Sequence, residues 1–188
     1  MPVNLRYPLL ASSIALLAVA CGGGPTVYRH PSSSASQIRT IAVMPCENLA
    51  GADSRTAERI RQLMLVELQA NKDFEVVEPG LVTKIVSERS TASALSPEDL
   101  KDLGAALHAD GLLFRSILSS ADSRGVDGGG EATIQLRLVE TRSGATVWTA
   151  SQSMNGSSFT KRFFGLASDP GAEVARAVIR SELATLPR

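Results

Sequence analysis

The segment ATIQLRLVETRSGATVWTASQS, residues 132–153, decides the fold, because it contains the clearest strand-turn-strand pattern of the chain. Its first half places apolar side chains at every second position, which is typical of a strand with one buried face. The Arg-Ser-Gly sequence at 142–144 predicts a tight turn. Residues 146–153 return as a second strand, with Trp148 as its dominant packing group. The segment therefore predicts an antiparallel hairpin.

Three more strands are predicted upstream of this hairpin. Ile38–Met44 has a continuous apolar centre, which favours a central strand covered on both faces, and Pro45 ends its pairing. Phe74–Glu78 is a short β-rich run, and Leu112–Ser119 is a second strongly apolar strand. The polar, glycine-rich Ser120–Gly130 segment predicts a hairpin loop. A strand follows it, whereas a phosphate-binding glycine loop needs a helix there.

A helix start is predicted at Ser96, which is followed by Pro97 and, three residues after the cap, by Asp99. This order is a serine cap, a proline at the first helical position and a capping acid. Leucines at 100, 103 and 107 give the helix a buried stripe, and Gly104 leaves room for close packing. His108 ends the helix, where the helix dipole favours a cation, so we expect a structural role for it.

Helical spacing predicts three other helices. Thr56–Asn71 carries apolar residues on one stripe, with Arg61 and other polar residues on the remaining faces. Leu81–Ser87 predicts a brief helix, and the chain closes with an amphipathic helix that begins at Asp169 or Pro170 and covers the sheet. The element order predicts an α/β fold, a layered sandwich of a mixed β-sheet with packed helices. We assign residues 38–188 to this single domain.

The amino-terminal 20 residues predict a secretory signal peptide. A single arginine, Arg6, precedes a short apolar run that starts at Leu9 and ends in small residues before Cys21. The run is shorter than the roughly 20 apolar residues of a membrane-spanning helix. The ending LAVAC, residues 17–21, resembles a lipobox, which implies that Cys21 is acylated and attaches the protein to a membrane. An ordinary signal peptide with a coincidental cysteine is the alternative.

Residues 21–37 are rich in Gly, Ser and Pro and have no hydrophobic period, so we expect a lipidated tether. A flexible coil of this length spans roughly 20–25 Å. With Cys21 acylated, the second cysteine, Cys46, has no partner for an intrachain disulfide. Its position at the end of an apolar strand favours a buried, inert thiol over a reactive one.

Composition and motifs argue against several function classes. The chain has 19 basic and 19 acidic residues, and it lacks the basic excess of nucleic-acid-binding proteins. No metalloprotease, Cys-x-x-Cys, nucleophile-elbow or P-loop motif is present, and the two histidines are His30 in the tether and His108 at a helix end. We therefore predict no catalytic residue, no bound cofactor and no metal site, and expect that the protein is not an enzyme.

The connection Gly156–Asp169 mixes phenylalanines with two basic residues. Such a mixture is found where a protein meets a membrane surface or a protein partner. Burial of the phenylalanines as core contacts of an irregular connection is the alternative. The candidate contact residues are Phe159, Lys161, Arg162, Phe163 and Phe164.

Three segments resemble a known group of envelope proteins. Residues 41–51, IAVMPCENLAG, are similar to the first strand and loop of the TolB amino-terminal domain and of the CsgG and LpoB families. Residues 100–111, LKDLGAALHADG, resemble their helix leading into a strand, and residues 138–151 resemble their terminal hairpin. The resemblance implies a TolB-N/CsgG-like fold. CsgG-like channels contain additional hairpins that build a pore, and this chain has no room for them.

These observations together predict a non-catalytic, lipid-anchored accessory or adaptor protein of the cell envelope. We expect an envelope protein as its partner during assembly, export or peptidoglycan synthesis. The alternative is an oligomeric subunit of a CsgG-like secretion complex. In known lipoproteins an aspartate directly after the anchor favours retention in the inner membrane. This chain has Gly22 at that position, so the resemblance implies that the protein is attached to the periplasmic face of the outer membrane.

Overall fold

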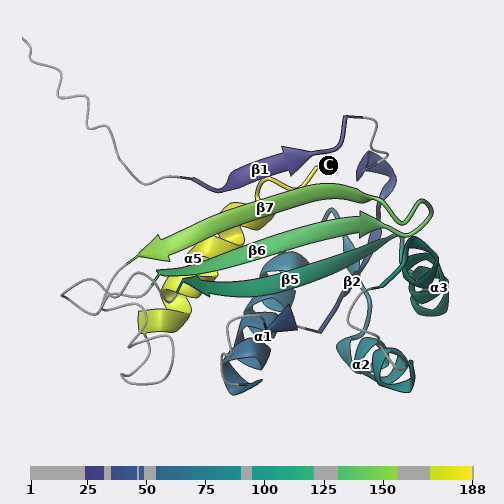
Figure 1. The fold of residues 1–188 in the computed structure, drawn as a ribbon, viewed down its shortest axis with the longest axis horizontal. Coiled ribbons are helices and arrows are strands. Elements are labelled where there is room, and N and C mark those ends of the chain that lie inside the picture. Colours follow the sequence, from purple (N-terminus) through teal and green to yellow (C-terminus); the bar gives the residue numbers. More distant parts are fainter. Residues whose placement is uncertain are drawn as a thin grey trace, which may run out of the picture.

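The structure, a computed structural model, combines one β-sheet with helices on both of its faces (Figure 1). It describes residues 24–31, 35–45, 47–48, 54–89, 95–120, 131–155 and 170–187. The elements are β1 (Thr26–Arg29), η1 (Ala35–Gln37), β2 (Thr40–Val43), β3 (Glu47–Asn48), α1 (Ser54–Ala70), β4 (Glu75–Val76), α2 (Pro79–Glu88), α3 (Pro97–Leu107), β5 (Gly111–Ser120), β6 (Glu131–Glu140), β7 (Thr146–Asn155) and α5 (Pro170–Leu183).

The sheet is mixed, as predicted. Its seven strands run in the order β1-β7-β6-β5-β2-β4, with the two-residue strand β3 alongside β5. Strands β1, β7, β6 and β5 pair antiparallel with one another in this order. Strand β2 pairs parallel with both β4 and β5. The predicted hairpin is the pair β6–β7, so the segment at 132–153 occupies the middle of the antiparallel half of the sheet.

Two hydrophobic clusters cover opposite faces of β2. Ile41 and Val43 belong to the larger cluster, which lies between the sheet and helices α1 and α5. Ala42 and Met44 belong to the smaller cluster, beneath α2 and α3. Residues that alternate along a strand point to opposite faces, so the continuous apolar run of β2 is buried on both sides. This confirms the prediction of a central strand.

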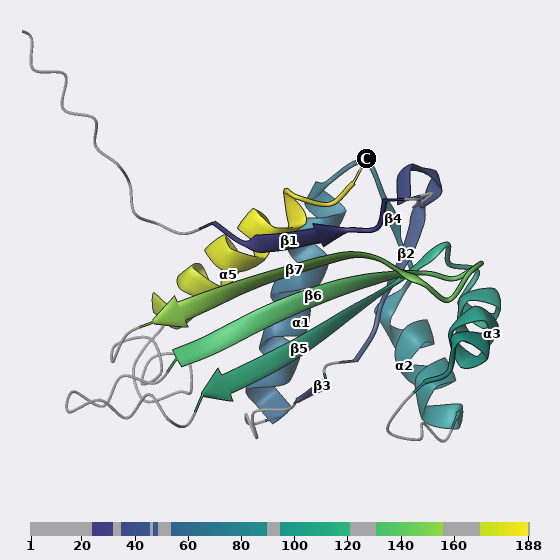
Figure 2. The ribbon, with the colours of Figure 1, turned by 45° about the horizontal axis from the view of Figure 1, so that its top comes forward.

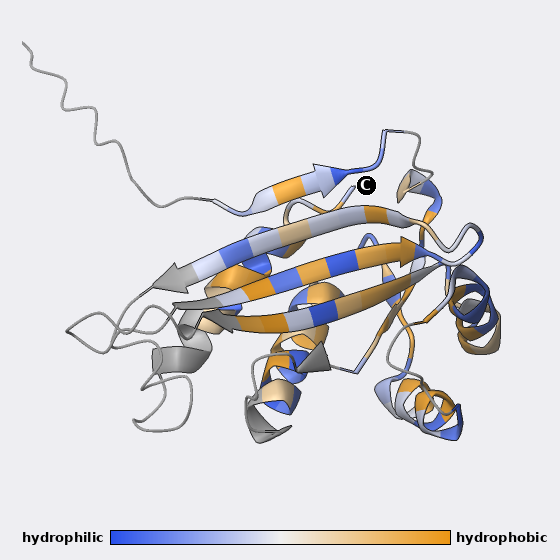
Figure 3. Ribbon diagram, viewed as in Figure 1, coloured by the Kyte–Doolittle hydropathy of each residue, from blue (hydrophilic) through white to orange (hydrophobic). Residues whose placement is uncertain are grey.

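The helices follow their sequence signals. Ser96 caps α3, its hydroxyl accepts from the Asp99 N–H at 3.2 Å, and the Asp99 carboxylate accepts from the Ser96 N–H at 2.9 Å. The predicted capping box is confirmed. Helices α1 and α5 lie behind the sheet, so α5 covers it as expected, and α5 runs along β7 (Figure 2). Along β6, hydrophobic and hydrophilic bands alternate (Figure 3).

The predicted tether is too long. Thr26–Arg29 forms edge strand β1, which pairs antiparallel with β7, and Ala35 is buried in the larger cluster. In β1 only Val27 packs against that cluster, so the strand is held mainly by backbone pairing. Backbone pairing leaves no hydrophobic period in the sequence, which is why the composition indicated a coil. The chain from Cys21 to the first strand contains four residues.

Arg61 also departs from its predicted place on an outer face of the Thr56–Asn71 helix. Its side chain is buried, and its Nη2 donates to the Pro79 carbonyl at the start of α2 at 3.1 Å. A long arginine stem can pack against apolar neighbours while its guanidinium finds a carbonyl. The signal peptide, Cys21, Cys46 and Phe159–Phe164 lie outside the described residues.

Gly104 lies where α3 contacts the turn that follows β6, so a substitution at this position tests how closely the two pack. A Cβ at this position would overlap Cβ and Cγ2 of Thr141. The Thr141 hydroxyl donates to the carbonyl of Ala109 at 2.8 Å and to that of Asp110 at 3.0 Å, so its side chain cannot easily turn away. We expect Gly104→Ala to lower the free energy of unfolding by about 1–3 kcal/mol, although alanine favours helices. Denaturant unfolding measures the change.

The matched control is Gly24→Ala, because a Cβ there meets no atom within 4 Å. This variant should unfold at the same denaturant concentration as the parent protein. Equal stabilities of the two variants would contradict the close packing of α3 on Thr141.

Candidate interaction surface

One face of the antiparallel half of the sheet has no helix over it beyond its end at Phe114 and Val139, which packs in the smaller cluster with α3. We call this surface the open face; Figure 1 looks onto it, and no helix lies in front of β6 or β7. In β6 and β7 its side chains alternate with buried ones such as Leu136 and Trp148. All of its described side chains are partly or fully exposed. They are Thr26, Tyr28, Ser116, Leu118, Thr133, Gln135, Arg137, Thr149, Ser151 and Ser153.

The open face is polar but nearly uncharged. Thr133 and Ser153 share a hydrogen bond between their hydroxyls at 2.8 Å. Arg137 is the single charged residue among its described side chains, and its guanidinium lies 4.6 Å from the centre of the Phe114 ring, in a cation–π contact. Tyr28 is 51% exposed and Leu118 is 38% exposed. Few charges and an exposed tyrosine are features of surfaces that contact another protein.

Strand β1 closes one edge of the open face. The His30 N–H, directly after β1, donates to the Val147 carbonyl at 3.0 Å. On the opposite face of the sheet, Arg29 donates to the Thr185 carbonyl at 2.7 Å. The Trp148 indole donates to the Thr185 hydroxyl at 3.2 Å. The residues that follow α5 therefore hold both β7 and its edge strand in place.

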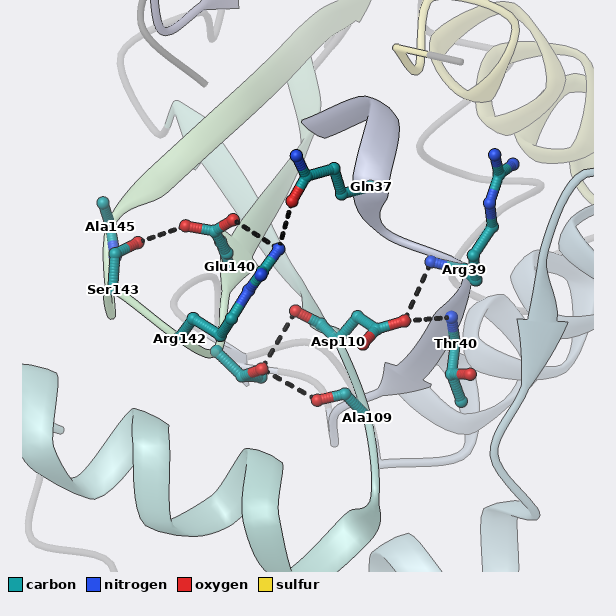
Figure 4. Close-up of polar contacts among 10 residues, drawn as sticks. Gln37, Arg39, Thr40, Ala109, Asp110, Glu140, Arg142, Ser143 and Ala145 are labelled. Carbon is teal, nitrogen blue, oxygen red and sulfur yellow. Dashed lines mark hydrogen bonds and ion pairs between the residues drawn. The ribbon is translucent and has the colours of Figure 1, made fainter. Parts of the chain in front are cut away.

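A polar junction fixes the segment between β1 and β2 to the turn between β6 and β7 (Figure 4). The Asp110 carboxylate accepts from the backbone N–H groups of Arg39 and Thr40, each at 3.0 Å. Arg142 donates to the Gln37 side-chain carbonyl at 2.6 Å. Each of these contacts joins two parts of the fold, which indicates a structural role for the junction.

Glu182 is a buried acid that the sequence analysis missed. Its side chain is fully buried, and neither carboxyl oxygen has a hydrogen-bond partner among the described residues. Burial raises the pKa of Glu182 to about 9, and the backbone N–H of Gln152, which lies nearby without reaching hydrogen-bond geometry, opposes this rise only in part. The carboxyl is therefore protonated at neutral pH. Its spacing of four residues from Val178 placed it on the buried stripe of α5, which was the signal available in the sequence.

A second acid on this side of the sheet is ionised. Glu67 of α1 accepts from Arg180 of α5 at 2.9 Å and pairs with Arg176 at 3.0 Å. The hydrogen bond from Arg180 lowers the pKa of Glu67 below its ordinary value. This ion pair network connects the two helices.

The described residues contain no set of three or more histidine, cysteine or acidic side chains placed to share a metal ion. His108 ends α3 as predicted, in a left-handed conformation with φ of 49°. None of the helices in the described ranges is both long and apolar enough to cross a bilayer. The structure does not describe the predicted site residues Cys21, Phe159, Lys161, Arg162, Phe163 and Phe164.

Solved structures show the same fold. No protein-family profile and no curated protein matches the chain. A PelC dodecamer from Paraburkholderia phytofirmans is 17% identical with a TM-score of 0.52, over 86% of this chain and 96% of its own. Lipoprotein GNA1162 from Neisseria meningitidis is 17% identical with a TM-score of 0.51, over 79% and 99%. The LpoB C-terminal domain from Escherichia coli is 15% identical with a TM-score of 0.46, over 62% and 82%.

At these identities the similarity concerns the fold alone. It agrees with the predicted α/β sandwich, and PelC and GNA1162 are covered almost completely. The shared architecture therefore includes the mixed sheet and its helices, and function has to be argued from the surfaces of this chain.

Glu182 makes stability depend on pH. In the unfolded chain its carboxyl loses the proton near its ordinary pKa of 4.5, whereas in the folded protein the pKa is about 9. The folded state therefore binds more protons between these values, so the free energy of unfolding falls as pH rises, by up to about 1.4 kcal/mol per pH unit. We expect Glu182→Gln to remove this slope and raise the melting temperature at pH 8. Thermal unfolding from pH 4 to pH 9 measures how the melting temperature of each protein depends on pH.

Glu75→Gln is the control, because Glu75 is an exposed acid on edge strand β4. Its melting temperature should follow that of the parent protein at every pH. A parallel shift of both variants, with the slope intact, would show that the Glu182 carboxyl is charged and solvated in the folded protein.

Proposed function

We propose that the protein is a non-catalytic, lipid-anchored accessory protein of the cell envelope, which presents its α/β domain to a protein partner. The open face is the observation that carries this proposal. It is a continuous, nearly uncharged sheet surface that includes an exposed tyrosine and leucine, Tyr28 and Leu118. A partner protein can cover such a face through hydroxyl hydrogen bonds and apolar contacts without burying an unpaired carboxylate. Envelope assembly, export and peptidoglycan synthesis are the processes that such an adaptor serves.

The membrane anchor is the lipid on Cys21. The lipobox-like residues 17–21 support it, and so does the similar fold of a protein named as a lipoprotein, GNA1162. Two or more acyl chains give stable attachment, since each buried methylene contributes roughly 0.8 kcal/mol. Gly22 after the anchor favours the outer membrane, with the domain facing the periplasm.

An adaptor needs no chemistry of its own, and the described polar groups fit that role. Asp99 caps a helix, Asp110 binds backbone N–H groups and Glu67 pairs with arginines. Glu182 is enclosed between α5 and the sheet. These acids have structural partners or are buried, which supports a protein that binds rather than catalyses.

Self-assembly is the second candidate function. The observation that favours it is the PelC dodecamer, whose fold covers most of this chain. The protein would then act as a subunit of a secretion complex, with copies of the chain as its partners. Size-exclusion chromatography with light scattering on the detergent-solubilised protein separates the two: a strictly monomeric particle contradicts a ring.

The proposal also includes contacts with the membrane or the partner in the connection between β7 and α5. The residues proposed for these contacts are Phe159, Lys161, Arg162, Phe163 and Phe164. Their connection begins after Asn155 of β7 and ends at Pro170 of α5, so both of its ends are fixed by the sheet and the helix that covers it. Phenylalanines beside basic residues suit an anionic membrane surface.

The anchor predicts a defined mass and location. Intact-mass analysis of the membrane-extracted protein should show a chain that starts at Cys21 and carries acyl groups. Cys21→Ser should abolish acylation and move the protein out of the membrane fraction. An unmodified parent chain that retains its first 20 residues would contradict the anchor.

The open face predicts where a partner can be captured. A photo-crosslinking amino acid at Ser151, in the centre of the open face, should trap a specific envelope protein or a second copy of the chain in cells. The same amino acid at Gln69, an exposed position on α1, is the matched control and should trap neither. Equal labelling from both positions, identified by mass spectrometry, would contradict a docking role for the open face.

A further inference from the structure

Strand β1 leaves one edge of the sheet open. It stands at the end of the strand order, and no described strand pairs with it on the side away from β7 (Figure 1). The opposite edge strand, β4, has only two residues. An edge strand presents N–H and C=O groups that can pair with a strand of another chain. Strand β1 is therefore the longer of the two places where the described sheet can be extended.

The hydrogen-bond pattern identifies the backbone groups on this edge. The His30 N–H donates to the Val147 carbonyl, so His30 points its backbone groups toward β7. In an antiparallel pair, residues that bond to the neighbouring strand alternate with residues that do not. The β1–β7 register continues without a shift, so Tyr28 also bonds to β7. Val27 and Arg29 therefore point their N–H and C=O groups away from the sheet.

Prolines limit this edge at both ends. Pro25 and Pro31 fall on the same outward-facing positions as Val27 and Arg29, and proline has no N–H. Residues 26–29 contain no lysine, proline or bulge, which are features that block edge strands in other proteins. The Arg29 side chain is held on the helix side of the sheet by the Thr185 carbonyl. The edge is therefore short and open.

We propose that this edge joins two copies of the chain, which pair antiparallel through β1 about a two-fold axis at Tyr28. The observation that selects a second copy is that β1 is complementary to itself. With Tyr28 opposite Tyr28 of the second copy, Val27 lies opposite Arg29, and each uses both its N–H and its C=O. Pro25 then lies opposite Pro31, so no N–H is left unpaired there. The same edge serves both copies, as a two-fold axis requires.

The side chains favour the same register. Tyr28 is 51% exposed on the nearly uncharged open face, and aromatic side chains directly opposite each other stabilise paired strands. A shift by two residues in one direction would place Arg29 opposite Arg29, and like charges directly opposite are destabilising. The opposite shift would separate the tyrosines and place Arg29 opposite Pro25, which has no N–H to donate. The register centred on Tyr28 avoids both conflicts.

This pairing goes beyond the adaptor role proposed above, and it does not depend on the anchor at Cys21. It joins two seven-stranded sheets, so the open faces of the two copies form one surface. A pair of four-residue strands buries less area than the roughly 1,200 Å² of a stable interface. We therefore expect a weak dimer whose population rises with protein concentration.

Charges at position 28 test the pairing. Tyr28→Lys and Tyr28→Glu each place like charges opposite each other in the dimer and remove the aromatic pair. We expect each full-length variant, purified in detergent, to dimerise roughly tenfold more weakly than the parent protein. An equal mixture of the two variants should dimerise more strongly than either alone, because opposite charges then face each other. Sedimentation over a concentration series measures the dissociation constants.

Ser153→Lys and Ser153→Glu are the matched controls, because Ser153 is exposed on the open face but belongs to β7. These variants should dimerise as the parent protein does, alone and mixed, and thermal unfolding checks that every variant is folded. A parent protein that stays monomeric at every concentration overturns the proposal. A mixture of the two position-28 variants that is no stronger than either alone overturns it too.

A disulfide tests the register. The two copies of position 28 form a pair without hydrogen bonds, whose Cα atoms lie about 4.5 Å apart, within the range that a disulfide spans. Tyr28→Cys in a Cys46→Ala background should therefore give a covalent dimer on mild oxidation, above the level of the Cys46→Ala protein itself. Thr26→Cys is the control, because the two copies of position 26 would lie roughly 13 Å apart along the strands. Non-reducing electrophoresis measures the yields.

Equal dimer yields at positions 26 and 28 would contradict the register. The absence of a covalent dimer at position 28 would overturn the second copy as the occupant of the edge. It would mean that a different protein or another segment of this chain covers β1.

Discussion

The burial of Trp148 is the constraint on which the rest of the structure depends. This side chain is the largest that is fully buried, and its indole N–H is bonded to Thr185 after α5. Arg29 of β1 lies opposite Trp148 in the strand register and donates to the carbonyl of the same threonine. The central hairpin, the first strand and the segment that follows α5 therefore meet at Thr185. Loss of a buried tryptophan side chain costs about 3–5 kcal/mol in other proteins, and here it would also release two chain segments.

Much of the fold could be predicted because its strongest elements have local signals. The 132–153 hairpin alternates, α3 has a complete capping box, and the apolar run of β2 needs cover on both faces. Strand β1 could not be predicted, since its contribution is backbone pairing with residues that lie 119 to 125 positions away in the sequence. The burial of the polar side chains Arg61 and Glu182 could not be predicted either. Their burial depends on neighbours in α2 and β7, and local sequence supplies only their position on a helix.

The candidate surface was harder to predict than the fold. The polar residues of the open face, such as Thr133 and Ser151, alternate with apolar ones as they do on any strand with one wet face. Only the topology reveals that strands distant in sequence align them into one surface. It also reveals that α2 and α3 cover this side of the sheet near β2 and leave most of the same side of β6 and β7 uncovered. The sequence directed attention instead to the phenylalanine-rich connection, which stands out in composition. Composition identifies unusual segments, whereas a sheet surface such as the open face is made of ordinary ones.

Strand β1 also determines how the domain carries mechanical load. It lies lengthwise against β7, and hydrogen bonds between antiparallel strands are perpendicular to both. A pull on residue 24 along the strand direction therefore stretches all the β1–β7 bonds together, in shear. If the chain entered the sheet across the strands instead, the same pull would break the hydrogen bonds one at a time. A short strand loaded in shear resists detachment better than its four residues suggest, which would suit the proposed anchored domain when its partner moves relative to the membrane.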